Sequence, residues 1–156
     1  MIAEFERYHE LVLREMIVQS SLPLLIERFD SSGRVNRFRV NRRLGILIKH
    51  SAKRLPPWLF AFADDASEDV LELSHSVRSV WIALVCGSDG VVTVSLDEFK
   101  AVAASEDMSA RFLRVVRSKN QMYRVHGNCG TLAPKARGVA LMLTDATGTR
   151  GNADVA

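Results

Sequence analysis

The sequence predicts an α+β (α/β) fold: a single domain on a mixed central sheet, with an N-terminal helix and two further helices. Three observations lead to this prediction. They are an apolar stripe of helical period near the N-terminus, several short β-rich apolar segments, and helix-start signatures between those segments. With 156 residues and 47% apolar content, the chain is long enough to bury one core and too short for two.

Residues 3–19 form the first predicted element, an amphipathic helix. Its inward side chains recur at helical spacings: Phe5, Tyr8, His9, Val12 and Met16. Serines and a proline end this helix, and residues 22–29 are then predicted to be extended, closed by the turn-forming residues 30–33.

A basic hairpin is predicted next, with strands at 35–41 and 44–50. Alternation sets Arg37 and Arg39 on the face opposite to Phe38 and Val40. A two-residue Arg42-Arg43 turn would place the arginines beside Ile46 and Ile48, whereas a three-residue loop at 42–44 pairs Arg37 with Lys49 and Arg39 with Leu47. We favour the longer loop, which gathers Arg37, Arg39 and Lys49 into one charged surface with the loop arginines at its tip.

The later elements follow from the same kinds of pattern. The run Val80–Val85 is continuously apolar and β-branched, which is typical of a central strand covered on both faces. Ser95 and Glu98 have the spacing of a capping box. The predicted elements are strand 58–62, helix 66–77 with Val70, Leu71, Leu73 and Val77 inward, strands 80–85 and 91–94, helix 96–104, and a last hairpin of 112–117 and 121–125.

The domain is expected to span residues 1–132. Residues 133–156 are rich in small side chains, Gly and Thr, and are predicted to be a partly disordered C-terminal extension. Within it, residues 139–143 could form a weak element, and residues 147–156 are predicted to lack structure.

Positive charge is localised in this sequence. The stretch from Arg28 to Arg54 holds nine lysines and arginines and one acid, although the whole chain has a net charge of only +3. A second patch, between Arg111 and His126, contains no acid. Localised positive fields attract phosphates and other polyanions, so the sequence predicts a nucleic-acid-binding protein.

The predicted phosphate contacts come from both basic stretches. Arginines would act as bidentate forks and lysines as point charges. Trp58 could stack on an exposed base, but its place behind two prolines favours a core anchor. The candidate nucleic-acid-binding residues are Arg37, Arg39, Arg42, Arg43, Lys49, Lys53, Arg54, Arg114 and Lys119.

The order of helix, three strands, helix and strand resembles the αβββαβ core of restriction-endonuclease-like, or PD-(D/E)XK, nucleases over about residues 3–94. This resemblance implies an acid on the second strand and a Glu-x-Lys on the third, which together hold a divalent metal. Here Lys49 matches, but Leu47 occupies the acid position and the second strand has no carboxylate. The remaining acids are on the N-terminal helix: Glu6, Glu10 and Glu15.

A second resemblance rests on Gly45-Ile-Leu-Ile-Lys-His-Ser, on Pro57-Trp58 and on Leu84-Val-Cys-Gly-Ser-Asp-Gly. These segments look like those of small bacterial proteins with no established activity. The histidines and cysteines lack zinc-ligand spacing, no phosphate-binding glycine loop is present, and Cys86 is expected to be a buried, reduced thiol. No cofactor, metal site or catalytic residue is predicted.

Together these observations favour a non-catalytic, or catalytically degenerate, domain that binds nucleic-acid phosphates. One alternative is a protein-interaction module, as a homo-oligomer or in a bacterial complex, whose basic face meets an acidic partner. Another is a metal-dependent nuclease with displaced acids, which requires the N-terminal glutamates to approach Lys49. No segment reaches the roughly 18 apolar residues of a membrane span, and the N-terminus is charged, so we expect a cytoplasmic protein without membrane partners.

Overall fold

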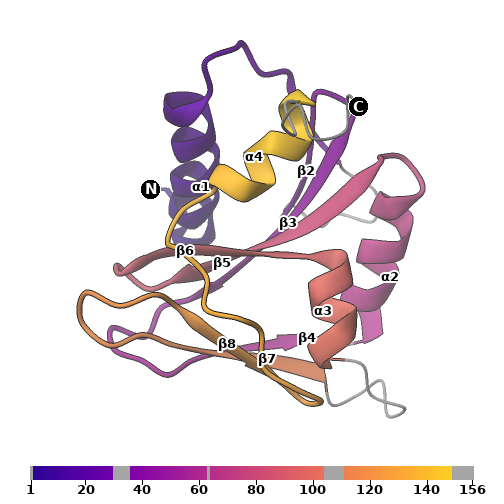
Figure 1. Ribbon diagram of the computed structural model, residues 1–156. Coiled ribbons are helices and arrows are strands. Elements are labelled where there is room, and N and C mark those ends of the chain that lie inside the picture. The colour runs from indigo at the N-terminus through magenta and orange to yellow at the C-terminus, as the bar shows by residue number, and fades with distance from the viewer. Residues whose placement is uncertain (1, 30–35, 63, 104–110, 149–156) are drawn as a thin grey trace, which may run out of the picture.

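The computed structural model describes residues 2–29, 36–62, 64–103 and 111–148, with the side chains of 64–67 left aside. Within these ranges the chain forms a mixed α+β domain of two sheets and four helices (Figure 1). None of the helices in these ranges is both long enough and apolar enough to cross a membrane. The elements in chain order are α1 Glu4–Gln19, β1 Ile26–Arg28, β2 Arg37–Val40, β3 Leu44–Ser51, β4 Trp58–Phe62, α2 Asp64–Ser74, β5 Ser79–Cys86, β6 Gly90–Ser95, α3 Leu96–Ala103, β7 Arg111–Val116, β8 Arg124–Gly127 and α4 Ala140–Thr147.

The larger sheet, sheet A, has the strand order β1-β2-β3-β5-β6. Strands β3 and β5 are parallel, and every other neighbouring pair is antiparallel. The side chains of β5 contribute to hydrophobic clusters on both faces of the sheet, as the continuous apolar run predicted. The burial of β5 on both faces was therefore predicted correctly, although the middle strand of sheet A is β3.

A second sheet, sheet B, was not predicted. Strand β4 leaves the hairpin region and pairs with β7, which in turn pairs with β8, all antiparallel. The bounds of the strand at 58–62 were predicted correctly, but its partner was not, because periodicity carries no information about pairing. The predicted mixed central sheet is sheet A, and the second sheet beside it was missed.

The elements stack in layers around sheet A (Figure 1). Helices α1 and α4 cover one face, where Val12, Met16 and Met142 pack against β3 and β5. Sheet B, α2 and α3 cover the other face, where Trp58 and Leu73 pack against Leu47. Sheet A is thus buried on both sides.

Helix α4 corrects the prediction for the C-terminal region. The weak element expected at 139–143 is a helix that begins at Ala140 and buries Met142, Leu143 and Ala146 in the core. The chain to Thr147 therefore belongs to the domain. Of residues 147–156, which were predicted to lack structure, Thr147 ends α4 and Gly148 caps it. Residues 149–156 and the turn predicted at 30–33 lie outside the described residues.

The β2–β3 hairpin has a three-residue loop, but it begins one residue earlier than predicted. Val40 pairs with Leu44, so the loop is Asn41 to Arg43 and Arg37 faces Leu47. Asn41 adopts a φ of 51°, which asparagine tolerates well. Its side chain accepts a hydrogen bond from the backbone N–H of Leu25 at 2.8 Å. Arg37 was predicted to pair with Lys49, so the strand register differs from the prediction by two residues. Because two is an even number, the arginines stay on the predicted side of the sheet.

Candidate nucleic-acid interface

The hairpin side that carries Arg37 faces the core instead of solvent. Gly45 lies opposite Arg39, and a Cβ at Gly45 would be 2.6 Å from Cγ of Leu73, so α2 packs directly against this side of β3. The side chain of Arg37 is 0% exposed. The predicted charged surface of Arg37, Arg39 and Lys49 is therefore wrong, because α2 and sheet B cover it.

Arg37 is held by acidic partners on α2. Its Nη1 donates to the backbone carbonyl of Asp69 at 3.1 Å and lies 3.5 Å from Oε2 of Glu72, while Nη2 is 3.8 Å from Oδ1 of Asp69. The guanidinium also lies over the ring of Phe29 at 4.9 Å. A side chain buried and compensated in this way cannot contact a phosphate, so Arg37 is removed from the candidate site.

Three other cations of the hairpin, Arg39, Arg42 and Lys49, are also tied to neighbours. Arg39 and Arg42 share Glu27, with N–O distances of 3.2 and 3.6 Å. Lys49 places its Nζ over the ring of Phe62 at 5.1 Å. Glu27 on β1 pairs with Arg39 across the ladder, so the strand added at the sheet edge supplies the neutralising acid.

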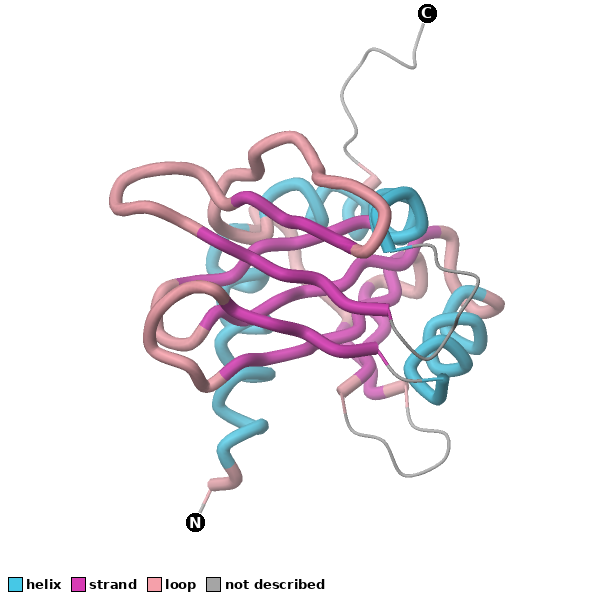
Figure 2. Tube along the Cα trace, turned by 90° about the horizontal axis from the view of Figure 1, so that it is seen from below, coloured by secondary structure: helices cyan, strands magenta, loops and turns pink. Residues whose placement is uncertain are grey.

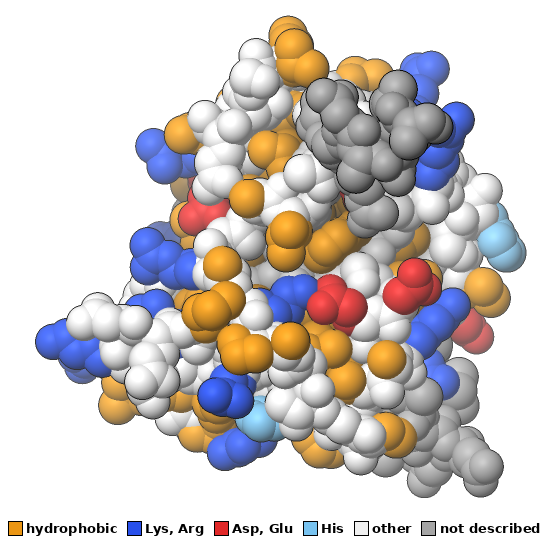
Figure 3. Space-filling model, in the orientation of Figure 1, with side chains coloured by type: hydrophobic (Ala, Val, Ile, Leu, Met, Phe, Trp, Pro, Cys, Tyr) orange, Lys and Arg blue, Asp and Glu red, His pale blue; other side chains and the backbone are white. Residues whose placement is uncertain are grey.

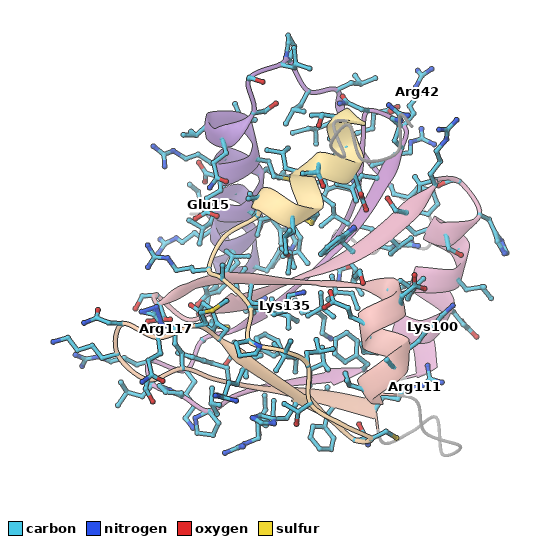
Figure 4. The ribbon with its side chains drawn as sticks, in the orientation of Figure 1. Glu15, Arg42, Lys100, Arg111, Arg117 and Lys135 are labelled. Atoms are coloured by element: carbon cyan, nitrogen blue, oxygen red, sulfur yellow. The ribbon has the colours of Figure 1, made fainter. Side chains whose placement is uncertain are left out.

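The two basic regions do not flank one face. Figure 4 shows Arg42 at the tip of the β2–β3 hairpin, whereas Arg111 and Arg117 lie far from it on the β7–β8 hairpin. The combined footprint that the sequence suggested is thus divided between two ends of the molecule.

The side of sheet B that faces away from sheet A is open. Trp58, Leu113 and Val125 point inward and are buried. The alternate residues point outward, and no helix covers them in the view of Figure 2. We call this surface the outer face; its side chains are Leu59, Ala61, Phe112, Arg114, Val116, Arg124 and His126.

The strands of sheet B and the segments at 51–57 and 117–139 carry cations and no acids. Residues 51–62 and 111–144 contain nine lysines and arginines and not one Asp or Glu. Within the described residues, Arg114, Lys119 and Arg124 have no carboxylate partner. The lower part of Figure 3, where sheet B lies, accordingly shows basic and apolar side chains without acidic ones.

Apolar side chains lie between these cations. Phe112 is 40% exposed and Leu59 is 62% exposed, and Leu59 pairs across the ladder with Arg114. Phe112 and Arg114 are two residues apart on β7, so they are about 7 Å apart along the same face. An exposed ring beside a guanidinium is an arrangement that can stack a base and bind its phosphate.

Asp89 anchors the basic loops to sheet A. The hydroxyl of Tyr123 donates to Oδ2 of Asp89, and Arg117 lies 3.2 Å from the same oxygen. Arg137 donates to the backbone carbonyl of Asp89 at 3.2 Å. Burial, followed by the bond to Asp89, raises the pKa of the Tyr123 hydroxyl, so it remains a donor. Asp89 is thus a structural anchor, and Arg117 is neutralised by it.

Trp58 is a core anchor, which confirms the favoured interpretation. Its ring is buried, and Nε1 donates to the carbonyl of Lys53 at 2.8 Å. This bond fixes the loop that carries Lys53 and Arg54 beside sheet B. Lys53 donates to the carbonyl of Pro57 at 3.2 Å, which is an uncharged acceptor.

The geometry required for displaced metal ligands is not present. Helix α1, with Glu6, Glu10 and Glu15, covers one face of sheet A, whereas Lys49 contacts Phe62 in the layer on the other face. In the described part of the chain, no three His, Cys, Asp or Glu side chains converge on a metal site.

The two cysteines differ in exposure. Cys86 is buried, as expected, and desolvation raises the pKa of its thiol, with a smaller effect of Asp89. Cys129 is exposed, and neither cysteine forms a disulfide bond.

Comparison with known proteins gave no match. No family model, no curated protein and no solved structure is significantly similar to this chain. The interpretation of the outer face therefore rests on its own chemistry.

The structure thus separates the predicted contacts into three groups. Arg37, Arg39 and Arg42 are paired with acids, and Lys49 contacts the ring of Phe62. Arg43 lies at a separate pocket. Lys53, Arg54, Arg114 and Lys119 belong to sheet B and its loops, together with Arg124, which sequence reasoning noted in the charge pattern but did not select. The acid-free run from Arg111 onward was the signal that favoured Arg124.

Proposed function

We propose that this protein binds single-stranded nucleic acid on the outer face of sheet B and does not cleave it. One observation carries the proposal: an open antiparallel sheet face, free of acids, that sets the exposed ring of Phe112 beside Arg114. Unpaired guanidinium groups bind phosphate, and exposed rings stack on bases.

A single strand suits this face better than a duplex. Bases in a duplex are already stacked, so Phe112 would gain nothing from them, whereas an unpaired base can lie flat on the ring. Leu59 extends the apolar surface beside the ring, and Met122, which is also exposed, lies beyond the other end of β7. Phosphates can then reach Arg114, Arg124 and the loop residue Lys119.

We propose no catalytic activity because the carboxylates lie away from the outer face. The outer face has no carboxylate with which to hold a divalent ion, and the glutamates of α1 lie beyond sheet A. The endonuclease-like topology stays a prediction, and binding by the outer face does not depend on it.

Fluorescence anisotropy with labelled 12-nucleotide DNA and RNA, single- and double-stranded, tests the proposal. We expect Arg114→Gln with Arg124→Gln to weaken single-strand binding at least tenfold, because two charge-assisted hydrogen bonds worth about 1.5–3 kcal/mol each are lost. The slope of log K against log salt should become shallower by about 1.4, since each phosphate contact contributes about 0.7 on single strands.

Arg42→Gln is the matched control, because Arg42 is exposed but paired with Glu27 at the other end of the molecule. It should bind like the wild type. Equal loss in the control and the double variant, or no binding at low salt, would contradict the proposal. Including magnesium and checking strand length tests for cleavage, which we do not expect.

A protein-interaction role is the second candidate, favoured by the exposed apolar side chains Leu55, Leu59 and Met122. In that case the protein would co-purify with an acidic partner or form an oligomer, and nuclease treatment would not dissociate it. Oligonucleotides would then show no affinity for the outer face.

A further inference from the structure

A polar pocket lies away from the outer face, and no residue of sheet B lines it. It has a volume of about 450 Å³, which is within the range of small-molecule sites. Its walls come from the start of β3 and β5, from the start of α3 and from the end of α4. Four segments distant in sequence thus enclose one space.

Two arginines form one wall of this pocket. The carbonyl of Arg43 accepts the backbone N–H groups of Arg78 at 3.0 Å and Ser79 at 3.2 Å, so the two arginines are held next to each other. Both side chains line the pocket. Unlike Arg37 and Arg39, neither has an ion-pair partner among the described residues.

The end of α4 keeps Arg43 at the rim of the pocket. Gly148 has a φ of 70°, and a Cβ there would lie 2.5 Å from Nη1 of Arg43. The backbone conformation favours glycine at this position, and the guanidinium of Arg43 lies directly against it. The negative end of the helix dipole also favours a cation at this place.

Hydrogen-bond acceptors also line the pocket. Trp81 is buried, and its Nε1 donates to Oδ2 of Asp145 at 2.7 Å, which orients that carboxylate. Asp97 also lines the pocket, at the start of α3. Two guanidinium groups and two carboxylates in one pocket complement a ligand that carries both a negative group and hydroxyl or amino donors.

We propose that this pocket binds a phosphate monoester of a hydroxyl-bearing body, with the phosphate on Arg43 and Arg78 and the hydroxyl groups on Asp145 and Asp97. A phosphate monoester carries about −1.5 to −2 charges at neutral pH, which matches two guanidinium groups better than a carboxylate does. Sugar phosphates and mononucleotides share this chemistry.

Isothermal titration calorimetry of the full chain with four probes tests the proposal: ribose 5-phosphate, adenosine 5′-monophosphate, ribose and inorganic phosphate. We expect both esters to bind, ribose to show no binding, and inorganic phosphate to bind at least tenfold more weakly than the esters. Tenfold tighter binding of the nucleotide would assign the pocket to nucleotides, and equal binding would assign it to sugar phosphates.

Variants distinguish the pocket from other cationic surfaces. Arg43→Gln and Arg78→Gln should each weaken ester binding about tenfold through a lost charge-assisted contact. Asp145→Asn should weaken ester binding and leave the weak binding of inorganic phosphate unchanged; its amide oxygen can still accept from Trp81. Lys100→Gln is the control, because Lys100 is an exposed cation on α3 that does not line the pocket (Figure 4).

Ester binding that is absent at millimolar concentration, or that is the same in both arginine variants as in the control, would overturn the proposal. Melting curves confirm that the variants fold. The test is independent of the proposed nucleic-acid binding, because Arg114→Gln with Arg124→Gln should leave ester binding unchanged and Arg43→Gln should leave oligonucleotide binding unchanged.

Discussion

The β2–β3 hairpin and sheet B are both rich in arginine and lysine, but their surroundings differ. In the hairpin, Glu27 on β1 and Asp69 and Glu72 on α2 lie within 4 Å of the guanidinium groups of Arg37 and Arg39. The strands of sheet B and the residues between β7 and β8 contain no acid, and Arg114 and Arg124 are exposed. A cation therefore contributes to folding in the first region and to the external field in the second. The density of positive charge along a sequence does not distinguish these roles; the acids supplied by neighbouring elements do.

The largest expected effect tests the structural half of this comparison. Arg37→Ala should lower the free energy of unfolding by about 3–5 kcal/mol, because it leaves Asp69 buried without its counterion. Asp69 is only 5% exposed. Urea denaturation at pH 7 measures the change. Arg114→Ala, the matched substitution on the outer face, should change stability by about 0.5 kcal/mol or less. Equal losses in the two variants would remove the distinction between the regions.

The next effect tests the functional half. Phe112→Ala should weaken single-strand binding by about 1–3 kcal/mol, which is the contribution of one base stacked on an aromatic ring. The salt dependence should not change, because the ring carries no charge. Anisotropy titrations at several salt concentrations measure both quantities. Leu71→Ala, at an exposed apolar position on α2, is the control and should bind like the wild type.

If Phe112→Ala changes the salt slope instead of the affinity, the ring acts by positioning Arg114 and not by stacking. If it changes neither, the apolar part of the outer face does not contact the strand, and the face binds by charge alone.

Elements with a strong local pattern could be predicted from the sequence. The amphipathic stripe fixed α1, the continuous apolar run fixed β5, and the Ser95–Glu98 capping box is present, with reciprocal hydrogen bonds of 3.0 and 3.2 Å. In each case the residues that determine the element lie within it or one turn away. Local physics was sufficient there.

The charged site could not be predicted in the same way, because its burial depends on contacts between distant segments. Alternation correctly placed Arg37 and Arg39 on one side of the sheet, but it did not indicate which layer covers that side. The helix at α2 illustrates the same limit. Leu71 was predicted to face inward and is 59% exposed, whereas Asp69 is buried. Helix α2 turns the carboxylate of Asp69 inward because Arg37, 32 residues earlier in the sequence, lies on that side of the helix.

The pH dependence of the free energy of unfolding tests how the β2–β3 hairpin packs against α1. His9 on α1 packs edge-on against Phe38 of β2, and His50 of β3 stacks on Tyr8. Burial lowers the pKa of both imidazoles. The pKa of His9 is lowered further by the nearby His50 and raised by Glu6. The pKa of His50 is raised by Glu4 and lowered further by Lys49. As the pH falls, the two imidazoles of the unfolded chain therefore bind protons near pH 6.5, whereas those of the folded chain bind protons only at lower pH.

Stability should therefore be constant above about pH 7.5 and fall as the pH decreases through 6.5 towards the lower folded pKa values. Urea denaturation between pH 5.5 and 8 measures this slope, in a range where carboxylates contribute little. His9→Phe should reduce the slope, while His75→Asn, at an exposed position after α2, should not. A slope that His9→Phe leaves unchanged would place the responsible proton elsewhere, with His50 as the next candidate.

The smallest effect concerns a single loop lysine. Lys119 lies between β7 and β8, exposed and without an acidic partner in the described chain. If it contacts one phosphate, Lys119→Gln should make the salt slope shallower by about 0.7 and weaken single-strand binding only a few-fold at moderate salt. Lys100→Gln, an equally exposed lysine on α3, should leave the slope unchanged. Anisotropy from 50 to 300 mM salt separates these outcomes. A slope that changes equally in both variants would mean that the strand responds to net charge alone, and the distinction between the outer face and the rest of the surface would no longer hold.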